Sequence, residues 1–279
     1  MKKWHLLVVV LSVLSQVFCV DCLADKLTII TTTSPIPSNP DPTILIRSLD
    51  SFMTVPGFKE CPKIIVFDGI PNYNMYLKDD YEQYKENVQI LTETHPSFHN
   101  TKLVFCAEHR HLAHSLKEAV KHVKTPYIFV HQHDFKLVKP IDVIGIIRSM
   151  DENPLLKHIR LPRHQVKQTC WDFIVDEKIE GVSYVPLCRT YGWSDNDHFA
   201  RKSYYDNFIF PKIKGKRPME VVINPIMRRA TKADPALHHH FGTYLYGNYG
   251  DSRCIIHLDG KRFQLKERIA NKNKEKESV

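Results

Sequence analysis

The sequence predicts an α/β fold with a mostly parallel sheet, helices on both faces and an irregular C-terminal half. In the first half of the chain, short apolar runs rich in β-branched residues alternate with segments of helical periodicity. Such alternation is typical of right-handed βαβ units, which place parallel strands side by side. After Pro140 the alternation weakens, so we expect the second half to depart from this regular pattern.

The elements of the first half follow from these patterns. A helix opens at Asp41-Pro42, where an acidic cap precedes a proline that fits the first helical turn. The helix at 110–123 is the clearest, because its apolar residues recur every three or four positions. Strands are expected at 27–33, 63–69, 101–106 and 127–130, with a further helix at about 78–91. In the second half, helices are expected at 142–151 and 197–205, and strands at 157–161 and 182–188.

The composition is that of a globular protein, with 43% hydrophobic and 25% charged residues. The formal net charge is +8, and half of it falls in residues 261–279, which hold seven Lys or Arg and three Glu. The rest of the chain is only mildly basic, which argues against a nucleic-acid partner. We expect residues 261–279 to form a basic, disordered tail.

The N-terminus has the pattern of a secretory signal. Lys2 and Lys3 precede an apolar run over residues 6–20, which is shorter than the roughly 20 residues that cross a bilayer. Cleavage is expected after Cys19 or Ala24, and the alternative is a short uncleaved signal-anchor that tethers the chain to a membrane. Residues 1–24 are therefore predicted to direct the chain to the lumen of the endoplasmic reticulum or Golgi, or out of the cell.

Beyond this segment five cysteines remain, an odd number that allows at most two disulfides in an oxidising compartment. The pairing favoured by closeness in sequence is Cys170–Cys188, and other pairings stay open. Because no CxxC spacing occurs, a structural zinc site built from cysteines is not expected.

Polar residues follow the predicted strands at their carboxyl ends. Residues 125–134 read TPYIFVHQHD, a buried strand that runs straight into a polar cluster ending in Asp134. Asp68 follows an earlier strand, and the loop 32–39 follows the first. Ligands of open parallel sheets bind beyond these ends, so all three segments are expected to converge on one cleft. The alternatives are an ordinary polar strand end and, for Asp68, a turn cap with Gly69.

With the helix before it, this segment resembles the nucleotide-sugar core of GT-A glycosyltransferases, especially family-2-like members. Their strand ends in Asp-x-Asp, which holds a divalent metal against the donor diphosphate. Here Gln132 stands at the first Asp and Asp134 at the second, so either one carboxylate does the work of two or His131 or His133 helps. The resemblance implies that Asp134 and a late histidine, best matched by His257, bind Mn²⁺ or Mg²⁺. An imidazole ligand favours Mn²⁺.

Two alternatives concern the late histidine. His257 could be a partly buried, hydrogen-bonded residue, and the run at 238–240 could instead trap a metal in a loop. The nucleotide-binding residues that the resemblance implies are Thr32, Thr33, Asp68 and Gln132.

Residues 191–201, YGWSDNDHFAR, resemble the acidic motif of the same family. Inverting members use an acidic residue there as the base that deprotonates the acceptor hydroxyl, and Asp195 falls at that position, with Ser194 where a Glu often stands. The resemblance also places Trp193 and Asp197 against the acceptor. The alternatives are that Ser194 or Asp195 caps a helix and that Trp193 is a core residue.

The resemblance covers roughly residues 27–260, and we expect one GT-A-like domain at 25–260. It implies a metal-assisted transfer from a nucleotide-sugar donor to a hydroxyl of a carbohydrate, lipid or protein acceptor, with inversion at the anomeric carbon. A catalytically silent binding protein is one alternative, favoured by Gln132 and Ser194. A secreted metal-dependent hydrolase is another, but the chain lacks HExxH and GxSxG motifs.

Overall fold

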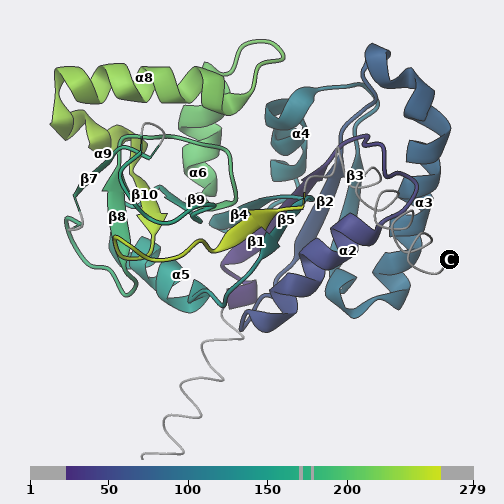
Figure 1. Cartoon of the computed structure of the whole chain (residues 1–279), viewed down its shortest axis with the longest axis horizontal. Coiled ribbons are helices and arrows are strands. Elements are labelled where there is room, and N and C mark those ends of the chain that lie inside the picture. Colours follow the sequence, from purple (N-terminus) through teal and green to yellow (C-terminus); the bar gives the residue numbers. More distant parts are fainter. Residues whose placement is uncertain (1–22, 170–171, 177–178, 259–279) are drawn as a thin grey trace, which may run out of the picture.

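The computed structural model describes residues 23–169, 172–176 and 179–258 (Figure 1). Residues 1–22 of the expected signal segment, the expected tail and Cys170 of the expected disulfide lie outside the described residues. Within the described part, Cys61, Cys106 and Cys254 are buried free thiols. No helix in these ranges is long and apolar enough to cross a membrane.

A nine-stranded sheet forms the centre of the fold, in the order β3-β2-β1-β4-β9-β6-β10-β8-β7. Its first four strands are parallel, and all four were predicted. They are β1 (Leu27–Thr33), β2 (Lys63–Phe67), β3 (Thr101–Phe105) and β4 (Tyr127–Gln132). The α/β class predicted from the sequence is therefore confirmed.

Helices cover both faces of this sheet. The longer ones are α2 (Thr43–Asp50), α3 (Lys78–Thr94), α4 (His111–Val120), α5 (Val143–Glu152) and α8 (Met219–Ala233). Ile29 and Ile30, neighbours in β1, enter different cores because successive strand residues point to opposite faces. The core of Ile29 includes apolar residues of α2, α3 and α5, and that of Ile30 includes those of α4 and α8.

The C-terminal half of the sheet is mixed, as the weaker alternation indicated (left side of Figure 1). Its strands are β6 (His158–Arg160), β7 (Ile174–Asp176), β8 (Leu187–Thr190), β9 (His198–Arg201) and β10 (Thr243–Tyr246). β9 is antiparallel to both β4 and β6. The remaining short helices are η1 (Ser51–Thr54), η2 (Asn72–Leu77), η3 (Pro96–Phe98), α6 (Lys202–Tyr204), η4 (Tyr205–Ile209), α7 (Phe210–Lys212), η5 (Pro235–Leu237) and α9 (His238–Phe241).

Two predictions for this half differ from the structure. A strand was expected at 182–188, but residues 182–186 form no strand and β8 begins only at Leu187. A helix was expected at 197–205, but residues 198–201 form β9 and only the residues after them are helical. The cause is tertiary, because β9 fills the gap between β4 and β6 and hydrogen-bonds to both. The prediction missed α8, whose pattern contains Pro225.

A second, two-stranded sheet pairs β5 (Phe135–Leu137) with β11 (Ile255–His257) in antiparallel register. β5 begins directly after the polar cluster at the end of β4. Because His257 pairs with Phe135, the last described strand brings its histidine back to the end of β4.

Candidate functional site

A cavity of about 700 Å³ lies beyond the carboxyl ends of β1, β2 and β4. Its walls come from the loop after β1, the loop between β3 and α4, η2 and the end of β4. The three segments that were predicted to converge here all supply lining residues: Thr32, Thr33 and residues after them in the loop 32–39, Asp68, and Asp134. Gln132 and His257, which the resemblance implied, line it as well. We call it the strand-end cavity. The convergence predicted from topology is thus confirmed, while the individual roles of these residues stay predictions.

Asp134 and His257 form the pair that the resemblance implied. Nε2 of His257 lies 2.9 Å from Oδ2 of Asp134, although the residues are 123 positions apart in the chain. Burial by itself would raise the pKa of Asp134, but nearby His133 and the hydrogen bond from His257 outweigh it and lower the pKa to about 2. Asp134 therefore carries its negative charge at neutral pH.

The 2.9 Å separation is that of a hydrogen bond, and a carboxylate and an imidazole are both groups that bind divalent cations such as Mn²⁺. No group of three or more His, Cys, Asp or Glu in the described ranges is arranged to hold a metal ion. Two protein ligands suit ions that also take oxygens from a bound phosphate and from water.

The structure distinguishes the two histidines that could support Asp134. His131 is fully buried, with Nδ1 2.7 Å from Oδ2 of Asp197 and Nε2 2.5 Å from Oγ of Ser48, so both nitrogens are occupied. His133 lines the strand-end cavity, and its Nδ1 lies 3.3 Å from the carbonyl oxygen of Thr32.

A carbonyl oxygen only accepts, so Nδ1 of His133 carries the proton and Nε2 presents a lone pair. Nε2 has no hydrogen-bond partner within the described residues. Burial lowers the pKa of His133, which favours this neutral form. Of the two histidines, only His133 is left able to bind a ligand.

Asp68 holds the loop that forms one wall of the strand-end cavity. Its Oδ1 accepts hydrogen bonds from the backbone N–H of Gly69 at 2.9 Å and of Arg110 at 2.7 Å, and from Oγ of Ser115 at 2.9 Å. Oδ2 accepts from the backbone N–H of His111 at 3.0 Å and lies 2.8 Å from Nδ1 of His109. The turn contact with Gly69 is therefore present, together with a larger role in fixing the start of α4.

The hydroxyls of Thr32 and Thr33 are engaged within the fold. Thr32 donates to the carbonyl oxygen of His131 at 3.3 Å, and Thr33 lies 3.4 Å from the hydroxyl of Tyr84. Both threonine side chains are therefore already oriented, Thr32 by the neighbouring strand β4 and Thr33 by helix α3.

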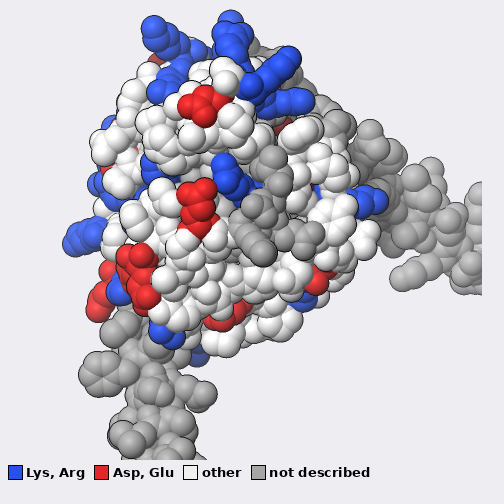
Figure 2. All heavy atoms as spheres, turned by 90° about the vertical axis from the view of Figure 1, so that its left-hand side faces the viewer, with Lys and Arg blue, Asp and Glu red and all other residues white. Residues whose placement is uncertain are grey.

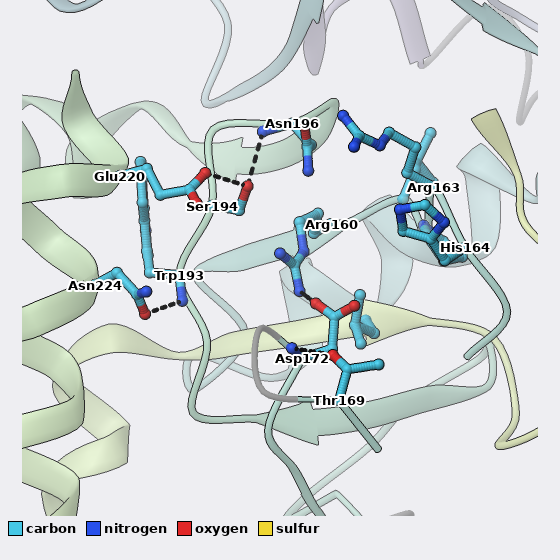
Figure 3. A pocket seen from close by; sticks show the side chains of 13 residues that line it. Arg160, Arg163, His164, Thr169, Asp172, Trp193, Ser194, Asn196, Glu220 and Asn224 are labelled. Atoms are coloured by element: carbon cyan, nitrogen blue, oxygen red, sulfur yellow. Dashed lines mark hydrogen bonds and ion pairs between the residues drawn. The ribbon is translucent and has the colours of Figure 1, made fainter. Parts of the chain in front are cut away.

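A second cavity, of about 350 Å³, opens beside the loop between β8 and β9 (Figure 3). Its polar lining includes Arg160 at the end of β6, Arg163 and His164 in the loop that follows, Ser194, and Glu220 at the start of α8. We call it the Arg160 cavity. Trp193 also lines it and is nearly fully buried, packed against His158 with ring centroids 5.2 Å apart. Most of Trp193 is thus a core side chain, with the rest available to a ligand.

Asp195, the predicted base, shares a hydrogen bond with Glu220. Burial, and then the negative charge of Glu220, raise the pKa of Asp195 to about 7. Glu220 in turn accepts a hydrogen bond from Oγ of Ser194 at 2.7 Å. Glu220 lines the Arg160 cavity and Asp195 does not, so the two hydrogen-bonded carboxyl groups form one unit that reaches the cavity through Glu220.

Glu220 was not found by sequence reasoning. The signal for it was an acidic residue after Pro218 in the first turn of a helix, a common place for Asp or Glu. The helix-cap alternative for Ser194 and Asp195 is wrong, because a strand and not a helix follows them.

The environment of Asp197 does not match its predicted role as an acceptor-binding residue. The side chain is fully buried, Oδ2 lies 2.7 Å from Nδ1 of His131, and Oδ1 accepts from the backbone N–H of Gln132 at 3.1 Å. With both oxygens occupied and no exposed surface, Asp197 has no access to an acceptor in this structure. It fixes the end of β4 instead.

Gln132 connects the two cavities. It lines the strand-end cavity, and its Nε2 donates to the backbone carbonyl of Asp195 at 3.1 Å. The backbone of the β8–β9 loop therefore lies one hydrogen bond from the wall that carries Asp134.

Neither a protein-family model nor a curated protein matches the chain. Solved structures do. A mannosyltransferase from Pyrobaculum calidifontis, PcManGT, in complex with GDP-Man and Mn²⁺, matches with a TM-score of 0.36 and 16% identity over 51% of this chain and 36% of that one. TarS of S. aureus matches with a TM-score of 0.47 and 11% identity over 86% of this chain and 38% of TarS. TarS 1–349 in complex with UDP matches with a TM-score of 0.46 and 12% identity, over 83% of this chain and 60% of that one.

The chain spans less than two thirds of the length of each of these proteins. Identities and TM-scores at this level describe a fold and do not assign an activity.

Proposed function

We propose that the protein is a glycosyltransferase that moves a sugar from a nucleotide-sugar donor to a hydroxyl acceptor, with a divalent cation and with inversion. The observation that carries the proposal is the hydrogen bond from Gln132 to Asp195. It supports the proposal because it joins the strand end that carries Asp134 to the loop that carries Asp195, and a reaction between two bound substrates needs its two half-sites close together.

In the proposed complex the donor occupies the strand-end cavity. Asp134 and His257 would hold Mn²⁺, or Mg²⁺, and His133 would offer its Nε2 lone pair beside them. The cation supplies Lewis-acid stabilisation of the diphosphate as it leaves. Thr32, Thr33, Asp68 and Gln132 form the walls against which the nucleotide lies in this proposal.

The acceptor hydroxyl would approach from the side of the Asp195–Glu220 pair. As its oxygen forms a bond to the anomeric carbon, the bond from that carbon to the diphosphate oxygen breaks and its electron pair leaves with the diphosphate. The hydroxyl proton passes to the carboxyl pair. A base with a pKa of about 7 is half ionised at neutral pH and suits this proton transfer.

A non-catalytic nucleotide- or carbohydrate-binding protein is the second candidate. It is favoured by Gln132 at the position of a metal-binding Asp and by the absence of a three-ligand metal cluster in the described ranges. The hydrogen-bonded series Ser48–His131–Asp197 does not support the hydrolase alternative, because all three side chains are fully buried. No substrate could reach such a serine.

The test measures thermal unfolding of the full-length chain with UDP, GDP or CMP, each with Mn²⁺, Mg²⁺ or EDTA. A ligand that binds only the folded state raises the melting temperature. We expect a metal-dependent rise with one nucleotide that disappears in Asp134→Asn. Asp206→Asn, an exposed aspartate paired with Lys202, is the matched control and should keep the rise.

Cleavage of the donor is tested separately by incubating the protein with the matching nucleotide sugar, where water takes the place of the acceptor hydroxyl, and following nucleotide release by mass spectrometry. Release that depends on Asp195 supports the enzyme. A nucleotide-dependent rise without any release would support the binding protein, and no rise with any nucleotide would overturn both. Residence in the secretory pathway, with a signal or membrane tether at residues 1–24, belongs to the same proposal and is tested by the N-terminus of the protein isolated from its cell.

A further inference from the structure

The Arg160 cavity has two chemically different walls, and this difference bears on the acceptor of the proposed transfer. Glu220, Ser194 and Asn224 lie on one side, and Arg163 and His164 lie across from them, with Arg160 between (Figure 3). At about 350 Å³ the cavity is at the small end of ligand sites, which are about 300–1,000 Å³, and suits one or two sugar rings.

The basic wall is built around a buried arginine. Arg160 is 4% exposed and pairs with Asp172, yet its Nε has no hydrogen-bond partner within the described residues. Arg163 and His164 are exposed, and neither forms an ion pair with a described residue. This wall thus holds two guanidinium groups and one carboxylate, that of Asp172, and the other carboxylate of the cavity, Glu220, belongs to the opposite wall.

Guanidinium groups recognise carboxylate, sulfate and phosphate through paired N–H donors of fixed geometry. A neutral sugar would offer these donors only uncharged acceptors. An acidic group would pair with them and would be held in a defined orientation.

The opposite wall is suited to hydroxyl groups. Glu220 presents carboxyl oxygens, and Oδ1 of Asn224 accepts from the backbone N–H of Trp193 at 3.2 Å, which fixes the amide. A hydroxyl placed there lies beside the proposed base, while an acidic substituent of the same molecule reaches the basic wall.

We propose that the Arg160 cavity binds the acceptor and that the acceptor is a carbohydrate bearing an anionic group, held by Arg160 and Arg163 while its hydroxyl faces Glu220. The inference rests on the proposed function for its reaction, but binding of the acidic sugar is independent of it.

Helix α8 extends the basic surface away from the cavity. Its first turn supplies Glu220, and its exposed Arg228, Arg229 and Lys232 follow. At 1.5 Å per residue, Arg228 lies about 12 Å along the helix from Glu220. Figure 2 shows Lys and Arg side chains gathered at the top of the face where this helix lies. Such a surface attracts a longer anionic chain towards the cavity.

The experiment titrates the full-length chain with monosaccharides by ligand-observed NMR. The probes are glucuronic acid, N-acetylglucosamine 6-sulfate and glucose 6-phosphate, against neutral glucose and N-acetylglucosamine. We expect at least one acidic sugar to bind about tenfold more tightly than its neutral counterpart, and Arg163→Gln to remove that advantage. The acid that binds most tightly distinguishes carboxylate, sulfate and phosphate.

Arg148→Gln is the matched control, since Arg148 is exposed on α5 and lies over the ring of Tyr184. It should bind the acidic sugar as the unchanged protein does, and both variants should keep the nucleotide-dependent rise in melting temperature. Equal affinity for acidic and neutral sugars, no binding of any sugar, or no effect of Arg163→Gln overturns the inference. If no nucleotide raises the melting temperature of the unchanged protein, the proposed function is overturned, but the inference about acidic sugars is not.

Discussion

Nδ1 of His131 lies 2.7 Å from Oδ2 of Asp197, and both side chains are fully buried. His131 belongs to β4, whose end carries Asp134, and Asp197 belongs to the loop that carries Asp195. This contact and the hydrogen bond from the backbone N–H of Gln132 to Asp197 hold the two proposed half-sites against each other.

Asp197→Asn should therefore lower stability more than ligand affinity. The amide keeps only one accepting oxygen, so either His131 or the backbone of Gln132 loses its partner inside the core. We expect a loss of about 2–4 kcal/mol in the free energy of unfolding. At roughly 2–4 °C per kcal/mol, thermal unfolding would show a fall of the order of 10 °C. An unchanged melting temperature with weaker acceptor binding would instead support the acceptor contact predicted from the sequence.

The pKa of Asp195 predicts the pH dependence of transfer. Because burial and Glu220 raise it to about 7, the base is protonated in acid and the rate should rise as pH passes through about 7. Glu220→Gln removes the negative charge but leaves the burial, which is the larger cause. The midpoint should then move to lower pH while staying above the ordinary value for Asp, about 3.9. Transfer rates between about pH 5 and 9 test this, and an unmoved midpoint contradicts the coupling.

The raised pKa of Asp195 also makes the stability of the fold depend on pH: the transfer rate should rise with pH, whereas the stability should fall. Since the folded-state pKa of Asp195 is raised, its contribution to stability is fully present below the unfolded value of about 3.9 and is lost as pH rises through about 7. Asp195→Asn is uncharged and can still donate to Glu220. At about pH 8 the free energy of unfolding of this variant should exceed that of the unchanged protein by roughly 2 kcal/mol. At about pH 5 the difference between the two should be smaller. Denaturant unfolding at the two pH values gives the comparison.

The parts of the structure that sequence reasoning found are those that local pattern controls. β1 is β-branched at every residue after Leu27 and buried along its length. The rule that strand ends meet at one edge placed Asp68 and Asp134 in one cavity. The partner of Asp134 came from the resemblance, since nothing local to Ile255–His257 indicates a return to the end of β4.

The parts that it missed depend on tertiary contacts. The four residues of β9 have no local pattern that distinguishes a strand from a helix. Their pairing with β4 and β6 makes them a strand. Glu220 meets Asp195 across 25 positions, from a helix that Pro225 made hard to recognise. The burial of Asp197 likewise follows from His131, which no spacing within 191–201 reveals.

Gly69 provides a test of the cavity wall that is independent of charge. A Cβ atom at Gly69 would overlap the backbone of Glu108 and His109, which cannot yield as a flexible side chain would. Gly69→Ala should therefore displace the loop that Asp68 holds and move His109 away from the cavity. We expect nucleotide affinity, measured by calorimetry, to fall at least about tenfold.

Gly250→Ala is the control, because nothing lies near its Cβ and only its positive φ opposes the change, at about 1 kcal/mol. That variant should lose some stability and keep its affinity. If both variants bind the nucleotide equally well, the loop does not shape the site, and the nucleotide must then lie closer to Thr33 and Asp134 than to Asp68.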